Sequence, residues 1–131
     1  MKRVLIVDDS KTFQKLIEHQ LKGQFHIVGK GSSGIEGYDL FQSLKPDLVL
    51  LDIVMPNCGG KECLQKILAS NPQANVIMVS SVGDDATIQE CLKLGAKAFV
   101  RKDQISQSDT GLSPFLTTVL KVTGGTVAEA A

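Results

Sequence analysis

The sequence has few features of secreted, membrane or nucleic-acid-binding proteins. Its 131 residues include only three cysteines, Cys58, Cys63 and Cys91, an odd number without the paired spacing of a zinc site. A chain of this length needs no disulfides to fold, so we expect reduced thiols. Fourteen basic residues balance fourteen acidic ones, which leaves no net charge to attract a nucleic acid or an anionic membrane.

Long hydrophobic runs are also missing. No stretch approaches the roughly 18 apolar residues of a membrane helix. The first apolar run, residues 4–7, is too short for an export signal. We therefore expect a soluble, cytoplasmic protein that has no direct nucleic-acid or membrane partner. A hydrophobic fraction of 43% and a charged fraction of 21% are ordinary for a globular chain of about one domain.

Short apolar runs alternate with longer segments of helical period, which is the pattern of βαβ units in a mostly parallel sheet. Strands are predicted at residues 4–7, 26–29, 48–51, 76–79 and 98–100. The weakly apolar second run suggests a sheet edge, and the strongly apolar third run suggests the centre. The simplest architecture is a doubly wound α/β fold of five strands, with two helices on one face and three on the other.

Helices are predicted between the strands and after the last one. Ser10 is the expected N-cap of the first helix, and Gly23 is expected to close it. The apolar face of this helix consists of Phe13, Leu16, Ile17 and Leu21. Gly59 and Gly60 are predicted to lie in a loop, and the last helix is predicted at residues 112–122. We assign residues 1–122 to the folded domain and expect the tail, residues 123–131, to fray.

Reactive or ionic side chains follow four of the predicted strands. Asp8 and Asp9 follow the first, Asp52 the third, Ser80 the fourth and Lys102 the fifth. Open parallel sheets bind ligands at the carboxyl ends of their strands. If the first and third strands are neighbours, three carboxylates meet there, and their mutual repulsion favours a bound cation. Ligands that are all oxygen suit Mg²⁺ or Mn²⁺.

The same set of residues suits a phosphoryl group. Lys102 offers a positive charge and Ser80 a hydroxyl donor, and both can hold phosphoryl oxygens. Asp52 is the candidate nucleophile, because a carboxylate can attack phosphorus and form an acyl phosphate. Phosphoryl transfer depends mainly on positioning and charge stabilisation, so a site this small is sufficient.

Four motifs, IVDDS, LLDIVMP, VIMVSS and GAKAFVRK, resemble in order and spacing those of the receiver domain of two-component response regulators. The chain is most similar to stand-alone receivers of the CheY type, over about residues 2–120. This resemblance implies a flavodoxin-like fold with strand order 2-1-3-4-5 and five helices. It also implies a signal carrier, not a metabolic enzyme, that catalyses its own Mg²⁺-dependent phosphoryl transfer and dephosphorylation.

The resemblance also assigns roles to single residues. It implies that Asp52 is the phosphoacceptor and that Lys102 pairs with the phosphate. The implied metal ligands are Asp8, Asp9, Asp52 and the backbone carbonyl of Val54, and the implied switch residues are Ser80 and Phe99. The donor would be a sensor histidine kinase or a phosphotransfer protein. The output would be an unidentified downstream protein, bound through the fourth helix, the fifth strand and the fifth helix.

The chain departs from the receiver pattern in two places. Asp103 follows Lys102 where most receivers have a proline, often after a cis bond, and a cis bond before a non-proline residue costs about 3 to 4 kcal/mol. The conformation of that loop is therefore open. Val54 and Val82 occupy the two positions that tune hydrolysis in receivers, and neither side chain can orient a water molecule. We expect a long-lived acyl phosphate.

Two other functions fit the same residues less well. A haloacid-dehalogenase-type phosphatase needs a second aspartate two residues after the nucleophile, but Ile53 and Val54 follow Asp52. A flavodoxin-like cofactor site is disfavoured because Asp8 and Asp9 would repel a phosphate. A receiver regulated by protein binding without phosphorylation, and a fragment of a longer regulator, are the alternatives that stay open.

Overall fold

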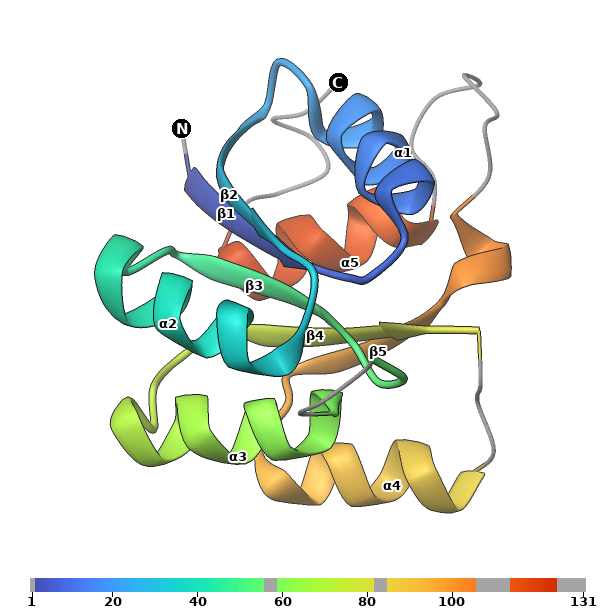
Figure 1. The fold of residues 1–131 in the computed structure, drawn as a ribbon. Coiled ribbons are helices and arrows are strands. Elements are labelled where there is room, and N and C mark those ends of the chain that lie inside the picture. The colour runs from blue at the N-terminus through green and yellow to red at the C-terminus, as the bar shows by residue number, and fades with distance from the viewer. Residues whose placement is uncertain (1, 56–58, 82–84, 106–113, 125–131) are drawn as a thin grey trace.

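Five parallel strands form one sheet in the computed structural model, which describes residues 2–55, 59–81, 85–105 and 114–124 (Figure 1). The strands are β1 (Lys2–Val7), β2 (Phe25–Gly31), β3 (Leu48–Asp52), β4 (Val76–Ser80) and β5 (Ala98–Arg101). Their order is β2-β1-β3-β4-β5. The predicted strand order is therefore confirmed, with β2 at an edge and β3 in the centre.

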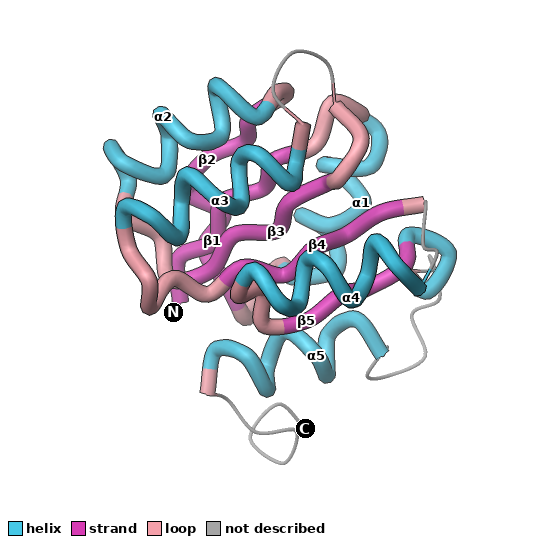
Figure 2. Tube along the Cα trace, turned by 90° about the horizontal axis from the view of Figure 1, so that it is seen from below, coloured by secondary structure: helices cyan, strands magenta, loops and turns pink. Residues whose placement is uncertain are grey.

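The helices cover both faces of the sheet. They are α1 (Lys11–Leu21), α2 (Gly34–Leu44), α3 (Gly60–Ser70), α4 (Asp85–Leu94), α5 (Pro114–Thr123) and the short 3₁₀ helix η1 (Lys102–Gln104). Helices α1 and α5 lie on one face, and α2, α3 and α4 lie on the other (Figures 1 and 2). This arrangement confirms the predicted division of two helices and three.

Alternating side chains of the strands fill two separate cores. Val4 and Ile6 pack on the α1 and α5 side, whereas Leu5 and Val7 pack on the side of α2, α3 and α4. Every residue of β3 and β4 is buried. Parallel strands covered on both faces have this continuous apolar character, which explains why the third and fourth runs are the clearest strand signals in the sequence.

Local signals set the ends of the helices. The Ser10 hydroxyl caps α1 by accepting a hydrogen bond from the backbone N–H of Phe13 at 3.2 Å. The chain reverses after α1 at Gly23, whose φ of +87° favours glycine, as predicted. Ser33 caps α2 in the same way as Ser10 caps α1. Glycine and serine at these positions therefore separate the strands from the helices that cover them.

Some boundaries differ from the sequence prediction. Strand β2 is longer than residues 26–29 because its pairing with β1 continues past a register shift between Val4 and Leu5. Helix α5 runs to Thr123, one residue beyond the predicted end, and its predicted first residues, 112 and 113, lie outside the described residues. The tail predicted to fray lies almost entirely outside them too.

The cysteines within the described residues are structural. Cys63 and Cys91 are free thiols, buried in the core between the sheet and α2, α3 and α4. Burial raises the pKa of Cys91, which keeps the thiol protonated and unreactive. Cys58 lies outside the described residues. No described helix is long and apolar enough to cross a membrane.

Candidate functional site

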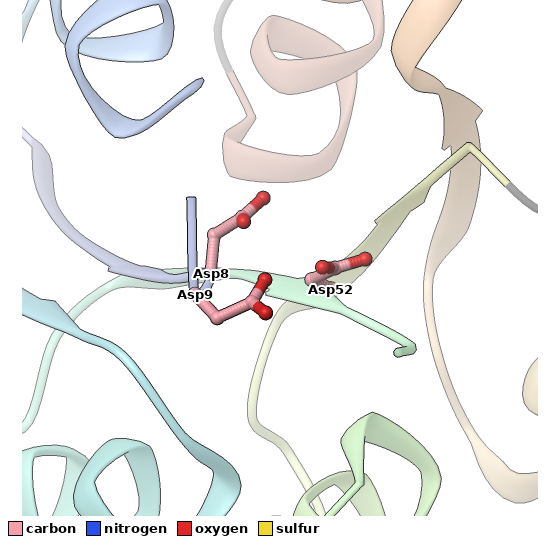
Figure 3. Close-up of side chains that lie close together, drawn as sticks. All are labelled: Asp8, Asp9 and Asp52. Atoms are coloured by element: carbon pink, nitrogen blue, oxygen red, sulfur yellow. The ribbon is translucent and has the colours of Figure 1, made fainter. Parts of the chain in front are cut away.

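Three carboxylates meet at the carboxyl ends of β1 and β3. The two strands pair in register through Val7 and Leu51, so the next residues, Asp8 and Asp52, emerge side by side. Carboxylate oxygens of Asp8, Asp9 and Asp52 lie within 4.8 Å of one another (Figure 3). Asp8 and Asp52 are only 2% and 4% exposed, whereas Asp9 is exposed. The meeting of carboxylates predicted from the strand ends is thus observed.

Lys102 is the cation of this cluster. Its Nζ lies 2.8 Å from Oδ2 of Asp8 and 3.4 Å from Oδ2 of Asp52. The residue follows β5 directly and begins η1, in which the carbonyl of Lys102 accepts a hydrogen bond from the N–H of Ile105 at 3.1 Å. The peptide bond between Lys102 and Asp103 is trans. The loop without the usual proline therefore still delivers the lysine to the acidic cluster.

The electrostatics of the cluster favour an added cation. Burial, and next the nearby charge of Asp8, raise the pKa of Asp52 from 3.8 to about 6, although Lys102 opposes the shift. Burial alone would lower the pKa of Lys102, but its hydrogen bond with Asp8 and the charges of Asp52 and Asp8 outweigh burial and raise it. Lys102 contacts two of the three carboxylates, Asp8 and Asp52. Oxygen ligands with this excess of negative charge fit a hard divalent ion such as Mg²⁺.

The structure also describes three other predicted site residues, Ser80, Phe99 and Val54. Ser80 ends β4 and is fully buried; since Asp52 pairs with Val79, Ser80 lies one step past the end of β3. Phe99, in β5, is half-buried against the core on the α2, α3 and α4 side. The side chain of Val54 is 59% exposed two residues after Asp52. Val82 lies outside the described residues.

Sequence reasoning missed a buried glutamine beneath the cluster. Gln14, on α1, is 6% exposed, and its Nε2 donates to the backbone carbonyls of Asp8 at 2.7 Å and Gly31 at 3.1 Å. These two bonds tie together the ends of β1 and β2. The available signal was periodicity, because Gln14 shares the buried stripe of Ile17 and Leu21, where a polar residue needs partners.

A glycine beside Asp52 was also assigned wrongly. The sequence predicted that Gly60 lies in a loop, but it is the first residue of α3. Its N–H donates to the carbonyl of Ile53 at 2.9 Å, and a Cβ at this position would lie 2.0 Å from the backbone oxygen of Asp52. The absence of a side chain therefore allows α3 to begin against the backbone that carries Asp52.

Comparisons with known proteins agree with this fold. The family model of the response regulator receiver domain matches residues 4–109. The chemotaxis protein CheY of Listeria monocytogenes is 38% identical over 103 residues, which cover 78% of this chain and 87% of that protein. A protein-glutamate methylesterase/protein-glutamine glutaminase of Bacillus licheniformis is 45% identical over 107 residues, but the match covers only 29% of it.

A solved structure gives the same result. The crystal structure of the CheX–CheY–BeF₃–Mg²⁺ complex from Borrelia burgdorferi contains a chain with a TM-score of 0.80 and 32% identity. That match covers 92% of this chain and 88% of the other. With the family model, the CheY relatives and the three-carboxylate cluster in agreement, the chain belongs to the response regulator receiver family and resembles its CheY-type members.

Proposed function

We propose that this receiver is a phosphorylation switch in which Asp52 accepts a phosphoryl group from the phosphohistidine of a sensor histidine kinase or a phosphotransfer protein. The observation that carries the proposal is the position of the Asp52 carboxylate. It is buried beside two other carboxylates, and Lys102 lies 3.4 Å from its Oδ2. A structural aspartate would gain nothing from this crowding, whereas a nucleophile needs basicity and a nearby cation.

In the proposed reaction, a carboxylate oxygen of Asp52 forms a bond to phosphorus while the bond from phosphorus to the donor nitrogen breaks. The electron pair of the broken bond leaves with the imidazole, which takes up a proton. A pKa of about 6 leaves Asp52 mostly ionised at neutral pH and more basic than an ordinary aspartate. Lys102 and Ser80 would hold the phosphoryl oxygens, because both lie at the same end of the sheet.

The residues that would hold Mg²⁺ are Asp8, Asp9, Asp52 and the backbone carbonyl of Val54. Support comes from the donor chemistry, since three carboxylates within 4.8 Å are hard oxygen ligands with more charge than Lys102 balances. When bound, the ion would supply positive charge to the phosphoryl oxygens. Mn²⁺ prefers similar ligands and is a possible substitute.

The proposed output surface consists of α4, β5 and α5. Strand β5 forms an edge of the sheet, with α4 on one face and α5 on the other (Figure 2). Ser80 ends β4. Phe99 of β5 pairs with Met78, which lies two residues before Ser80 in β4. If phosphate draws Ser80 toward Asp52, the vacated space can admit Phe99 and change the surface that a partner protein binds. To shift the active state from about 1% to about 99% of the population, phosphorylation must stabilise it relative to the inactive state by about 5.5 kcal/mol.

The proposed unit of this function is the folded domain, residues 1–122. The CheY relative is matched over 87% of its length, whereas the methylesterase relative is matched over 29%. Receivers similar to this chain therefore occur with and without further domains. Whether the output partner is a separate protein or an attached domain, it would bind the same surface.

The test is incubation with acetyl phosphate and Mg²⁺, followed by intact mass measurement. We expect the wild type to gain one phosphoryl group that hydroxylamine removes, and Asp52→Asn to gain none. Asp47→Asn is the matched control, because Asp47 lies at the opposite end of β3 and should leave the gain unchanged. No gain in the folded wild type would contradict the proposal and favour a receiver regulated by protein binding alone.

A further inference from the structure

We propose that Phe13 is a positioning residue that holds the Lys102 ammonium at the acidic cluster. Nζ of Lys102 lies 4.5 Å from the centroid of the Phe13 ring. A cation within about 6 Å of a ring centroid is attracted by the negative face of the ring. The consequence for phosphorylation rests on the proposed function, but the contact itself does not. On sequence alone, Phe13 was only one of the apolar residues of the first helix.

The backbone of Phe13 is linked through Ser10 to Asp8, which also binds Lys102. The N–H of Ser10 donates to Oδ1 of Asp8 at 2.8 Å, and the Ser10 hydroxyl accepts from the N–H of Phe13 at 3.2 Å. Oδ2 of Asp8 lies 2.8 Å from Nζ of Lys102, which completes a closed circuit of four residues. Phe13 is half-buried and also packs against the core beneath α1 and α5.

Lys102 needs such a contact because Asp8 and Asp52, the carboxylates that it contacts, are also proposed ligands of the divalent ion. Its side chain is long and flexible, and its charge is held by Asp8 and Asp52. Both carboxylates belong to the cluster that would bind a divalent ion, and an ion that shares their charge weakens their attraction for the ammonium. The ring carries no net charge to share. Phe13 is therefore the partner whose hold on Lys102 persists when the carboxylates are occupied.

Two substitutions at Phe13 distinguish the effect of the aromatic face from the effect of an apolar side chain. Phe13→Leu keeps an apolar side chain but removes the aromatic face, whereas Phe13→Tyr keeps the aromatic face. Phe25→Leu is the matched control, because Phe25 is a buried ring of the same core located at the start of β2, far along the sheet from β5. Urea denaturation compares the stability of the three variants with that of the wild type.

The first readout is the NMR signal of the Lys102 side-chain CH₂ next to Nζ, measured with and without Mg²⁺. We expect an upfield ring-current shift in the wild type, in Phe13→Tyr and in Phe25→Leu under both conditions, and its loss in Phe13→Leu. A wild-type signal at the ordinary lysine position, or a shift that survives in Phe13→Leu, would overturn the inference. The wild-type signal decides the question even if Phe13→Leu fails to fold.

The second readout is the rate of phosphorylation by acetyl phosphate at saturating Mg²⁺. We expect Phe13→Leu to lower the rate about three- to thirtyfold, Phe13→Tyr to restore it and Phe25→Leu to leave it unchanged. An equal loss in Phe25→Leu would show that only core packing matters and would overturn the inference. If the wild type accepts no phosphate, the proposed function fails, and the NMR signal alone decides the role of Phe13.

Discussion

The two ends of strands β1 and β3 carry the same kinds of charged residue but use them differently. At the amino end, the N–H of Arg3 donates to Oδ2 of Asp47 at 2.8 Å. The Arg3 guanidinium donates to the carbonyls of Leu44 at 2.6 Å and Lys45 at 3.1 Å, at the end of α2. Arg3 and Asp47 thus complete the hydrogen bonding of a strand end and a helix end. This end of the sheet is therefore structural.

At the carboxyl end, three carboxylates lie close together. Asp8 and Asp52 are buried with Asp9 nearby, and Lys102 is their cation. The pKa of Asp52, raised to about 6, shows that holding this carboxylate ionised costs free energy. An aspartate at a strand end thus stabilises the fold where the backbone supplies its partner, as it does at Asp47. Where another carboxylate is its neighbour, it is poised for a ligand instead.

The largest expected effect comes from the backbone that carries Asp52. In Gly60→Ala, the new Cβ would meet the backbone oxygen of Asp52 at 2.0 Å, so α3 must shift away from β3. We expect the free energy of unfolding to fall by about 3 kcal/mol, measured by urea denaturation. The matched control is Gly23→Ala, where no atom lies within 4 Å and only the positive φ is unfavourable, at a cost of about 1 kcal/mol. Equal losses would contradict the close contact.

The second expected effect, that of Asp52→Asn, is a gain in the free energy of unfolding. The pKa of Asp52 is about 6 in the folded protein and 3.8 ordinarily. The folded protein therefore binds a proton at Asp52 more tightly than the unfolded chain does. The contribution of Asp52 to stability is present below about pH 4, falls as the pH rises through 6 and stays lost above it. Without Mg²⁺, Asp52→Asn should therefore raise the free energy of unfolding by about 2 kcal/mol at pH 8 and very little at pH 4.

The control for this prediction lies at the structural end. Asp47→Ala removes the acceptor of the Arg3 N–H and should lower the free energy of unfolding by about 1 kcal/mol at pH 8. The two aspartate substitutions should thus change stability in opposite directions in the same urea titration. If Asp52→Asn is destabilising at pH 8, the ionised Asp52 carboxylate does not lower the stability of the fold, and the contrast between the two ends is wrong.

The smallest expected effect concerns the lifetime of the acyl phosphate. Val54 is exposed two residues after Asp52 and cannot orient a water molecule toward a phosphoryl group. Val54→Asn adds a polar side chain there and should shorten the half-life about tenfold, measured as loss of phosphate after the donor is removed. Ile35→Asn, at a similarly exposed apolar position on α2, is the control and should leave the half-life unchanged. Equal half-lives in wild type and Val54→Asn would contradict the expectation.

The sheet and its acidic cluster could be predicted because they depend on local patterns. The apolar runs mark buried parallel strands, and the residue after each run, such as Asp52 or Ser80, must lie at the carboxyl edge. The position of Lys102 at this edge followed from the same rule and from the family motif. The sequence could not predict that Lys102 still reaches the cluster without the proline, because this depends on the short helix η1, in which the N–H of Ile105 donates to the carbonyl of Lys102.

The contacts that support the site could not be predicted from spacing. Phe13 and Lys102 are far apart in the sequence, and a phenylalanine on an apolar helix face has no feature that indicates a cation contact. Gly60 looks like any loop glycine until α3 is packed against β3. Gln14 alone left a signal, as a polar residue in a buried stripe. Tertiary packing, not local sequence, decides these positions.

The proposed switch requires that a divalent ion and Lys102 leave a carboxylate oxygen of Asp52 free to attack phosphorus. The most direct test treats the protein with acetyl phosphate, reduces any acyl phosphate with borohydride to homoserine and maps the modified residue by peptide mass spectrometry. We expect homoserine at position 52 alone, formed with Mg²⁺ and not when the ion is chelated. Homoserine at Asp8 or Asp9, or equal modification without the ion, would contradict the proposed switch.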